Sequence, residues 1–245
     1  FNPFWDEVCH QLDGRTMYSS LPDSSYIDVS GGWHDAGDDL KYLLTSSYAT
    51  AVMLMSYRLQ PGIFKDLTNE FGQLFSNGIP DILDEARWGL DWLHKMHPHS
   101  DQLYHQVGDD RDHTGWKYPF CDSSDYGWGK GSYRVAYFAD GRSQGLGRHK
   151  SNSDGIANLA GRCAAAMAIA ADIWENDLQD INYANRCLQA AREFYEIGKK
   201  NEGVQQGNSF GAPYRYAEST WTDDMEWGAA ELYRITAETE FLQDA

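Results

Sequence analysis

Carboxylates, glycines and a histidine are concentrated in the stretch "SGGWHDAGDDLKYLL", residues 30–44. Asp35 and Asp38 precede an apolar run that predicts a helix, and the free N–H groups and dipole at a helix start favour anions. We therefore expect both carboxyls to stay ionised in mildly acidic solution. An ionised, partly exposed aspartate can take a proton from water as a general base. Helix capping would need fewer carboxylates and none of the three glycines, which let a ligand approach the backbone.

The elements that must position these carboxylates are predicted to be helices. Apolar residues recur at three-to-four spacing in five runs, whereas strand-like alternation is scarce, so the sequence predicts an all-α protein built from paired helices. Two connections are long and have no clear period, and loops of that length are usually functional. No change in composition marks a second domain. The five runs are 40–54, 82–93, 153–174, 183–197 and 225–236, and the long connections are 97–152 and 201–221.

Composition excludes several classes of partner. The chain has 245 residues, of which 37 are acidic and 20 basic, giving a formal net charge of −17. Without a basic run to neutralise phosphates, neither nucleic acid nor an anionic membrane is an expected partner. No stretch approaches the roughly 20 apolar residues of a membrane span. Phe1 opens no signal peptide, which leaves a mature exported chain and a cytosolic protein both open. Of the four cysteines, Cys163 and Cys187 are predicted to be buried free thiols.

The stretch "SGGWHDAGD", with "KY" two positions further on, resembles the signature of glycoside hydrolase family 9, mostly endoglucanases that cut β-1,4-glucans. The resemblance implies an (α/α)6 barrel, a toroid of six helical hairpins. Residues 1–245 would then be the N-terminal portion of a single catalytic domain, with about half of the barrel. It also implies a secreted or periplasmic location and no organic cofactor. Further matching stretches are "NGIPDILDEARWGLDWL" (77–93), "VGDDRDHTGW" (107–116), "NLAGRCAAAMAIAA" (158–171) and "DDMEWGAAELYRIT" (223–236).

The family inverts the anomeric centre in a single displacement, and two positions of the stretch carry its roles. Asp38 matches the catalytic base, and Asp35 matches its partner in holding the nucleophilic water. An inverting hydrolase needs two carboxyl groups about 6.5–9.5 Å apart, so that water fits between base and sugar. The general acid of the family is a Glu in an Asn-Glu motif near the end of the domain. We expect that residue beyond Ala245, and we expect the 245-residue chain alone to be inactive and poorly folded.

Aromatic and polar loop residues are the expected glucan contacts, because sugar rings have apolar faces and hydroxyl edges. His113 and Trp116 match family positions that hydrogen-bond and stack the sugar before the scissile bond. Tyr126, Trp128 and Tyr216 are further candidates without a firm family match. A loop tryptophan can equally serve ordinary packing.

The resemblance also implies a structural zinc ion, held in some members by two Cys and two His. Cys9, His10 and His34 match three of these ligands, and thiolate with neutral imidazole is suited to tetrahedral zinc. The fourth ligand would lie upstream of Phe1. If zinc binds here, the three side chains should converge. Otherwise, His34 is a packed histidine next to a small buried thiol.

Many members also bind calcium before the last of the five predicted helices. Ser219, Thr220, Asp223 and Asp224 correspond in order to its ligands, and carboxylate and hydroxyl oxygens are suitable for that cation. Asp224 stands where Glu is usual. Helix capping by Thr220 and Asp223 would explain the same residues.

Two alternatives to the β-glucan hydrolase remain open. A non-catalytic glycan-binding protein would keep the cleft and lack the general acid, and the sequence downstream would separate it from the enzyme. A metal-dependent hydrolase could use "DAGDD" and "DDRDH" as ligands, although their aspartate spacing fits no calcium loop.

Overall fold

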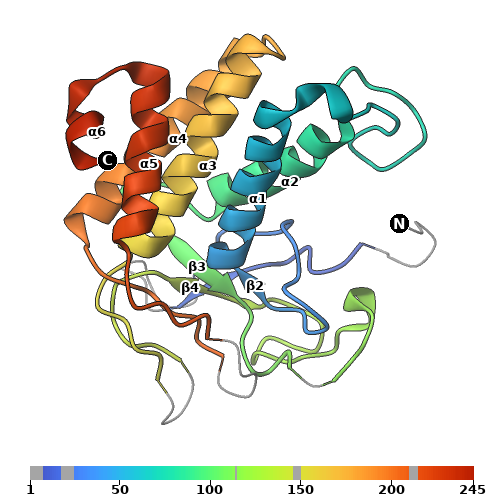
Figure 1. Ribbon diagram of the computed structural model, residues 1–245. Coiled ribbons are helices and arrows are strands. Elements are labelled where there is room, and N and C mark those ends of the chain that lie inside the picture. The colour runs from blue at the N-terminus through green and yellow to red at the C-terminus, as the bar shows by residue number, and fades with distance from the viewer. Residues whose placement is uncertain (1–7, 18–24, 114, 146–149, 210–214) are drawn as a thin grey trace.

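Helices dominate the part of the chain that the computed structural model describes, residues 8–17, 25–113, 115–145, 150–209 and 215–245. Figure 1 shows the helices side by side, with the strands and long connections gathered at one end of them. The helices are α1 (Leu43–Leu59), α2 (Asp81–Lys95), α3 (Ala157–Asn176), α4 (Ile181–Lys200), α5 (Thr222–Thr236) and α6 (Thr239–Asp244). The strands are β1 (Arg15–Met17), β2 (Lys41–Tyr42), β3 (Tyr104–Val107) and β4 (Val135–Phe138).

The five predicted helices are present as α1 to α5, and the short α6 was not predicted. α3 is the centre of the helical layer, since it packs against α1, α4 and α5. Its apolar circumference is buried on several sides, as its composition predicts, and Cys163 and Cys187 are buried free thiols. A Cβ at Gly161 would lie 2.4 Å from the backbone of Asp224, so the start of α5 rests directly on α3. No helix among the described residues has both the length and the apolar character to cross a bilayer.

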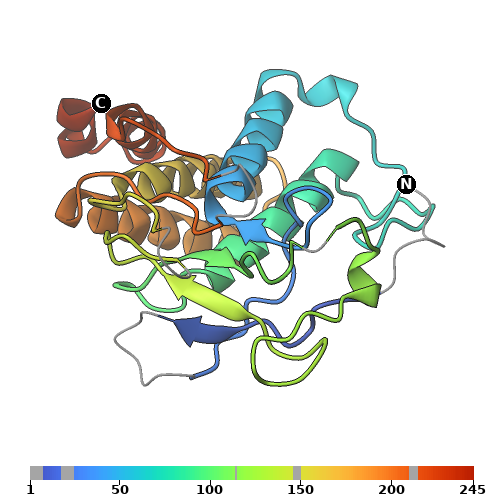
Figure 2. The same cartoon turned by 90° about the horizontal axis from the view of Figure 1, so that it is seen from below.

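A four-stranded sheet corrects the expectation that strands are nearly absent. The strand order is β1-β4-β3-β2, with β1 parallel to β4 and the other pairs antiparallel. β3 and β4 lie inside the connection 97–152, and both are buried along nearly their whole length. A strand of four residues buried on both faces has no polar alternation for a sequence pattern to reveal. Figure 2 shows the strands and long connections together beneath the helices.

Candidate active site

The loop that carries Asp35 and Asp38 is closed by its own backbone. The amide of Asp35 donates to the carbonyl of Leu40 at 2.8 Å, and the amide of Leu40 donates to Oδ1 of Asp38 at 3.1 Å. The expectation that both aspartates sit at a helix start is wrong, because α1 begins only at Leu43. Lys41 and Tyr42, just before α1, form β2 and pair with β3, and this pairing keeps their backbone extended. A sheet edge, rather than a helix terminus, therefore positions the carboxylates.

Asp38 is a buried carboxylate whose proton affinity is increased. Burial raises its pKa, and the nearby charge of Asp35 adds to the effect. The hydrogen bond from Leu40 and the imidazole of His113 act in the opposite direction. His113 Nε2 lies 3.8 Å from Asp38 Oδ2. The pKa is thus set by burial and not by a helix dipole, and a higher pKa makes a carboxylate a stronger general base.

Asp35 is held by a hydrogen bond at each oxygen. Thr45, on the first turn of α1, donates to Oδ1 at 3.1 Å. The hydroxyl of Tyr216 donates to Oδ2 at 2.5 Å. The ring of Tyr216 also packs edge-on against Tyr42 of β2, with centroids 5.2 Å apart. Residues 181 positions apart are brought together here, and the carboxylate of Asp35 has one fixed orientation.

Three of the five proposed sugar contacts lie at the aspartate loop. His113 and Tyr216 contact Asp38 and Asp35 respectively. Trp116 is 89% exposed, and its ring lies so close to Gly37 that a Cβ there would be 2.3 Å away. A cavity of about 570 Å³ lies alongside, lined by His34, Ala36, Gly37, Asp39, Trp116, Lys117, Tyr118 and Pro119. An exposed indole beside two carboxylates is the combination that a sugar-binding cleft requires.

Tyr126 and Trp128 are not brought to this loop. Tyr126 is only 6% exposed, and its hydroxyl accepts a hydrogen bond from the amide of Asp109 at 2.9 Å. Trp128 is half-buried and packs against a small cluster of Tyr126, Val135 and Tyr137. The burial of Tyr126 corrects the expectation that it meets substrate, because its hydroxyl instead holds the backbone at Asp109, four positions before His113.

Arg134 anchors the two segments that carry the site, and the sequence analysis did not identify it. Its guanidinium is buried and donates to Asp13, to Asp112 at 2.8 Å and to the backbone carbonyl of Asp39. Lys41 adds a second cation at 3.0 Å from Asp13. Burial alone would raise the pKa of Asp13, but the two cations outweigh it and hold that pKa well below its usual range. Arg134 therefore holds both the end of the aspartate loop, at Asp39, and the segment before His113, at Asp112.

Helix α2 supports the loop from the other side through indole N–H groups. Trp92 donates to the carbonyl of Val29 at 3.0 Å, and Trp88 donates to the carbonyl of Gly32 at 3.1 Å. Gly32 has φ +68°, and a Cβ there would lie 2.6 Å from the Trp92 ring. Only glycine can meet both conditions. The glycines of the quoted stretch therefore serve close packing against α2 and Trp116.

Cys9, His10 and His34 converge as the zinc expectation requires. Their ligating atoms all lie within 4.8 Å of one another, and His10 Nδ1 is 3.1 Å from His34 Nε2. Two nitrogens bound to one tetrahedral zinc ion would be roughly 3.4 Å apart. Burial, followed by the charges of Lys41 and Arg134, lowers the pKa of His34 to about 3, so its imidazole is neutral, as a ligand must be. The donor set is therefore suited to zinc.

The outer nitrogen of His10 is held by Asp122. His10 Nε2 lies 3.1 Å from Asp122 Oδ2, and Lys117 and Ser124 also donate to this carboxylate. Burial alone would raise the pKa of Asp122, but these hydrogen bonds keep it far below its usual range. A second converging group, His10, Asp39 and Asp122, already has the ammonium of Lys117 beside both carboxylates. Neither group combines ligands from "DAGDD" and "DDRDH", as the metal-dependent hydrolase would need.

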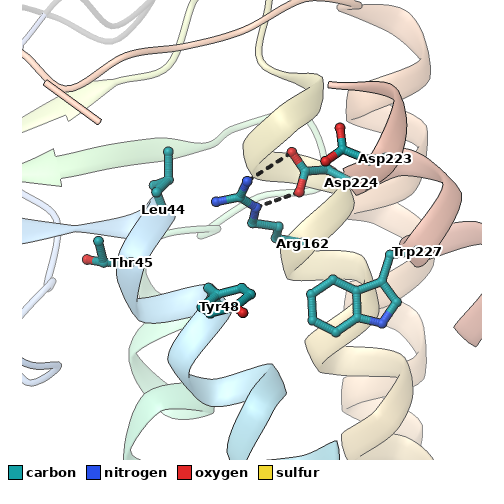
Figure 3. Close-up of a pocket in the computed structure, with 7 residues that line it drawn as sticks. All are labelled: Leu44, Thr45, Tyr48, Arg162, Asp223, Asp224 and Trp227. Carbon is teal, nitrogen blue, oxygen red and sulfur yellow. Dashed lines mark hydrogen bonds and ion pairs between the residues drawn. The ribbon is translucent and has the colours of Figure 1, made fainter. Parts of the chain in front are cut away.

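The calcium candidates lie at the junction of α3 and α5. Figure 3 shows Arg162 of α3 in direct contact with Asp224, and both line a cavity of about 450 Å³ together with Thr45 and Trp227. Arg162 Nε donates to Asp224 Oδ1 at 2.5 Å. Ser219 and Thr220 are exposed, and Thr220 interacts with Thr222 at 3.0 Å. Neither group of converging donors in the described part of the chain includes these residues, and the calcium site stays a prediction that this arrangement does not favour.

Comparison with known proteins agrees with the geometry. The family model for glycosyl hydrolase family 9 matches residues 2–245. Endoglucanase 19 of Arabidopsis thaliana is 31% identical over 222 residues, which are 89% of this chain and 30% of that protein. A metagenome-derived family 9 endoglucanase has a TM-score of 0.75 at 26% identity, covering 99% of this chain and 40% of its own.

The cellulase Cel9M of C. cellulolyticum, solved in complex with cellobiose, has a TM-score of 0.70 at 28% identity. That match covers 98% of this chain and 46% of the cellulase. The chain thus spans less than half the length of each of these three relatives. Because the family model matches nearly every residue, the chain belongs to glycosyl hydrolase family 9.

Proposed function

We propose that the protein hydrolyses β-1,4-glucosidic bonds in cellulose or a related β-glucan, with inversion at the anomeric carbon. The observation that carries the proposal is the loop of Asp35 and Asp38, which has His113 next to Asp38 and the exposed Trp116 against Gly37, in a chain of this family. Gly37 and Trp116 also line a cavity. The similarity to endoglucanases favours the enzyme over a glycan-binding protein without catalysis. Because the substrate is a polymer, we also propose that the protein works outside the cytoplasm.

Asp38 acts as the general base in this proposal. Its Oδ1 is engaged by the amide of Leu40, whereas Oδ2 faces His113 at 3.8 Å, a distance that leaves this oxygen able to receive a proton. Asp35 has one lone pair on each oxygen occupied by Thr45 and Tyr216. The remaining lone pairs can accept from a water molecule and align it for attack. Trp116 would stack the sugar, and His113 would hydrogen-bond its hydroxyls.

A protonated carboxyl on the other side of the bond completes an inverting reaction. We assign it to a glutamate outside residues 1–245, since the chain spans less than half of its solved relatives. The packing of α1 on α2, α3 on α4 and α5 on α6 supports the further proposal that these helices are three hairpins of an (α/α)6 barrel.

Replacement of Asp38 by Asn in the full-length protein tests the assignment. We expect kcat on a soluble β-glucan to fall by orders of magnitude while oligosaccharide binding is nearly unchanged, since the lost group acts in the transition state. Asp125→Asn, which changes an exposed aspartate of a neighbouring loop, should keep normal activity. The anomer first released, followed by NMR, tests inversion. Near-normal turnover of Asp38→Asn would remove the base assignment.

We also propose that Cys9, His10 and His34 hold a structural zinc ion. Bound there, the ion would tie the segment around Cys9 to the residue that precedes Asp35, and so support the loop from a third direction. Metal analysis of the purified full-length protein tests the proposal. A zinc content well below one per chain, after loading with excess zinc and removal of the unbound metal, would count against it.

A further inference from the structure

Arg162 links α3, at the centre of the helical layer, to the first turn of α5 and to the segment that precedes α5. Its Nε and Nη2 atoms donate to the two oxygens of Asp224 at 2.5 and 3.3 Å, and Nη2 also donates to Glu218. One turn earlier on α3, Asn158 donates to the other oxygen of Glu218 at 2.6 Å. The Arg162 side chain is only 13% exposed. Glu218, in the segment before α5, is therefore held by two side chains of α3, Asn158 and Arg162. Arg162 binds Asp224 as well.

The position that the family resemblance gives to calcium is thus occupied by a cation of the chain itself. Calcium takes six to eight oxygen ligands. Here, both oxygens of Asp224 face the guanidinium, and a second positive charge in the same place would be repelled. Burial alone would lower the pKa of Arg162, but its contacts with Asp224 and Glu218 outweigh burial and raise that pKa above its already high usual value. The guanidinium therefore stays charged at all ordinary pH values. The donor set therefore does not fit calcium.

The same segment delivers Tyr216 to Asp35. Tyr216 lies two positions before Glu218, and its backbone has φ +47°, a left-handed conformation that a tyrosine rarely adopts. The cavity next to Arg162 is also lined by Thr45, the other residue that donates to Asp35. Neighbouring contacts must hold such a backbone in place. The nearest anchors on the C-terminal side of Tyr216 are the contacts of Glu218 with Asn158 and Arg162.

We propose that Arg162 takes the place of a bound calcium ion at this junction and, by anchoring Glu218, positions Tyr216 against Asp35. Arg162 is a positioning residue, because it acts on Asp35 only through the segment that it holds. The consequence for activity rests on the proposed function, whereas the exclusion of calcium does not.

The first experiment measures Tm of the full-length protein with EDTA and with millimolar calcium. We expect the calcium-induced shift to be the same in the wild type and in Asp224→Asn, because Asp224 takes no part in calcium binding. Arg162→Gln should lower Tm by roughly 3–10 °C, since it leaves two carboxylates without their cation. Calcium should recover part of that loss, because the acidic oxygens become free. A wild-type calcium shift that disappears in Asp224→Asn would overturn the exclusion of calcium. An Arg162→Gln variant that calcium does not stabilise would overturn the proposal that Arg162 takes the place of the ion.

The second experiment is a double-mutant cycle on kcat with Tyr216→Phe. We expect Tyr216→Phe to cost roughly 10-fold, as for one hydrogen bond to a charged group. Arg162→Gln alone should cost about 3- to 10-fold with KM little changed, but less than 2-fold in the Tyr216→Phe background. Arg162→Lys should recover part of the activity. Equal costs of Arg162→Gln in both backgrounds would overturn the positioning role.

Arg58→Gln is the matched control. Arg58 makes a similar two-bond contact with Glu231, at 2.6 and 2.7 Å, between α1 and α5. Its loss should lower Tm by less, because Glu231 keeps Arg234 at 2.9 Å, and should not lower kcat at a temperature where the variant is folded. A wild-type protein that does not hydrolyse β-glucan would refute the proposed function, while the calcium experiment would still decide whether Arg162 occupies the cation position.

Discussion

Replacement of Arg134 by Met should destabilise the protein strongly. Arg134 is 1% exposed, and Asp13 and Asp112 are fully buried. Without the guanidinium, Asp112 has no cation within ion-pair distance among the described residues, whereas Asp13 keeps Lys41. Breaking a buried ion pair in this way costs about 3–5 kcal/mol. Since proteins are stable by about 5–15 kcal/mol, this is a large fraction of the free energy of unfolding.

For a domain of about 150–250 residues, such a loss corresponds to a fall in Tm of roughly 6–20 °C, and the fall is smaller in a longer chain because the entropy of unfolding is larger. Thermal and urea unfolding of the full-length protein would measure it, with Arg142→Met as the control. Arg142 pairs with Asp140 on the surface with a side chain that is 79% exposed, so its loss should cost less than about 0.5 kcal/mol. The gap between Arg134→Met and the wild type should narrow as pH falls below about 4, because the lowered pKa of Asp13 stabilises the wild type only above that range. A loss under about 1 kcal/mol at pH 7 would refute the view that Arg134 holds this network together.

Three further predictions concern the sugar contact, the zinc ligands and pH. Trp116→Ala should leave Tm nearly unchanged, because the indole is 89% exposed, and should weaken oligosaccharide binding roughly 3- to 10-fold by titration calorimetry; an unchanged Kd would contradict the contact. Asp122→Asn should weaken zinc binding about 10- to 100-fold in chelator competition. The amide nitrogen of Asn would donate to Nε2 of His10 and so favour the tautomer in which Nδ1, the nitrogen that faces His34, is protonated and cannot bind zinc. Asp125→Asn should bind zinc as the wild type does. Asp13 and Asp122 have lowered pKa values in the folded state, so their stabilisation is complete above about pH 5 and is lost as pH falls below about 4; stability that rises on acidification would falsify this.

The helical part of the fold could be predicted because its residues repeat. α2 and α4 have one buried and one exposed face, and α3 is apolar on nearly every side, so spacing alone locates them. The sheet could not be predicted, because β1 has only three residues and β2, β3 and β4, of two to four residues, are buried without alternation. That omission led to the error at the aspartate loop, where β2 stands between Asp38 and the start of α1.

Candidate site residues were identified where the motif is dense and missed where the partners are remote. Asp35, Asp38, His113 and Trp116 lie in two short motifs, and the structure brings them together. Tyr126 has the same residue type as Tyr216 and a similar loop setting, and only the fold shows that the first is buried. Both tyrosines lie in long connections without hydrophobic periodicity, so the sequence has no signal that distinguishes the buried tyrosine from the one that contacts Asp35.

The sequence by itself determined the family, the helical class and the motifs that bear carboxylates, because these depend on residue types at short, regular spacings. The tertiary structure alone decided what surrounds each charge. Arg134 meets Asp13 across 121 positions, Arg162 meets Asp224 across 62, and Tyr216 meets Asp35 across 181. Electrostatic effects of this kind depend on distance in space and on exclusion of water, and neither can be read from separation along the chain.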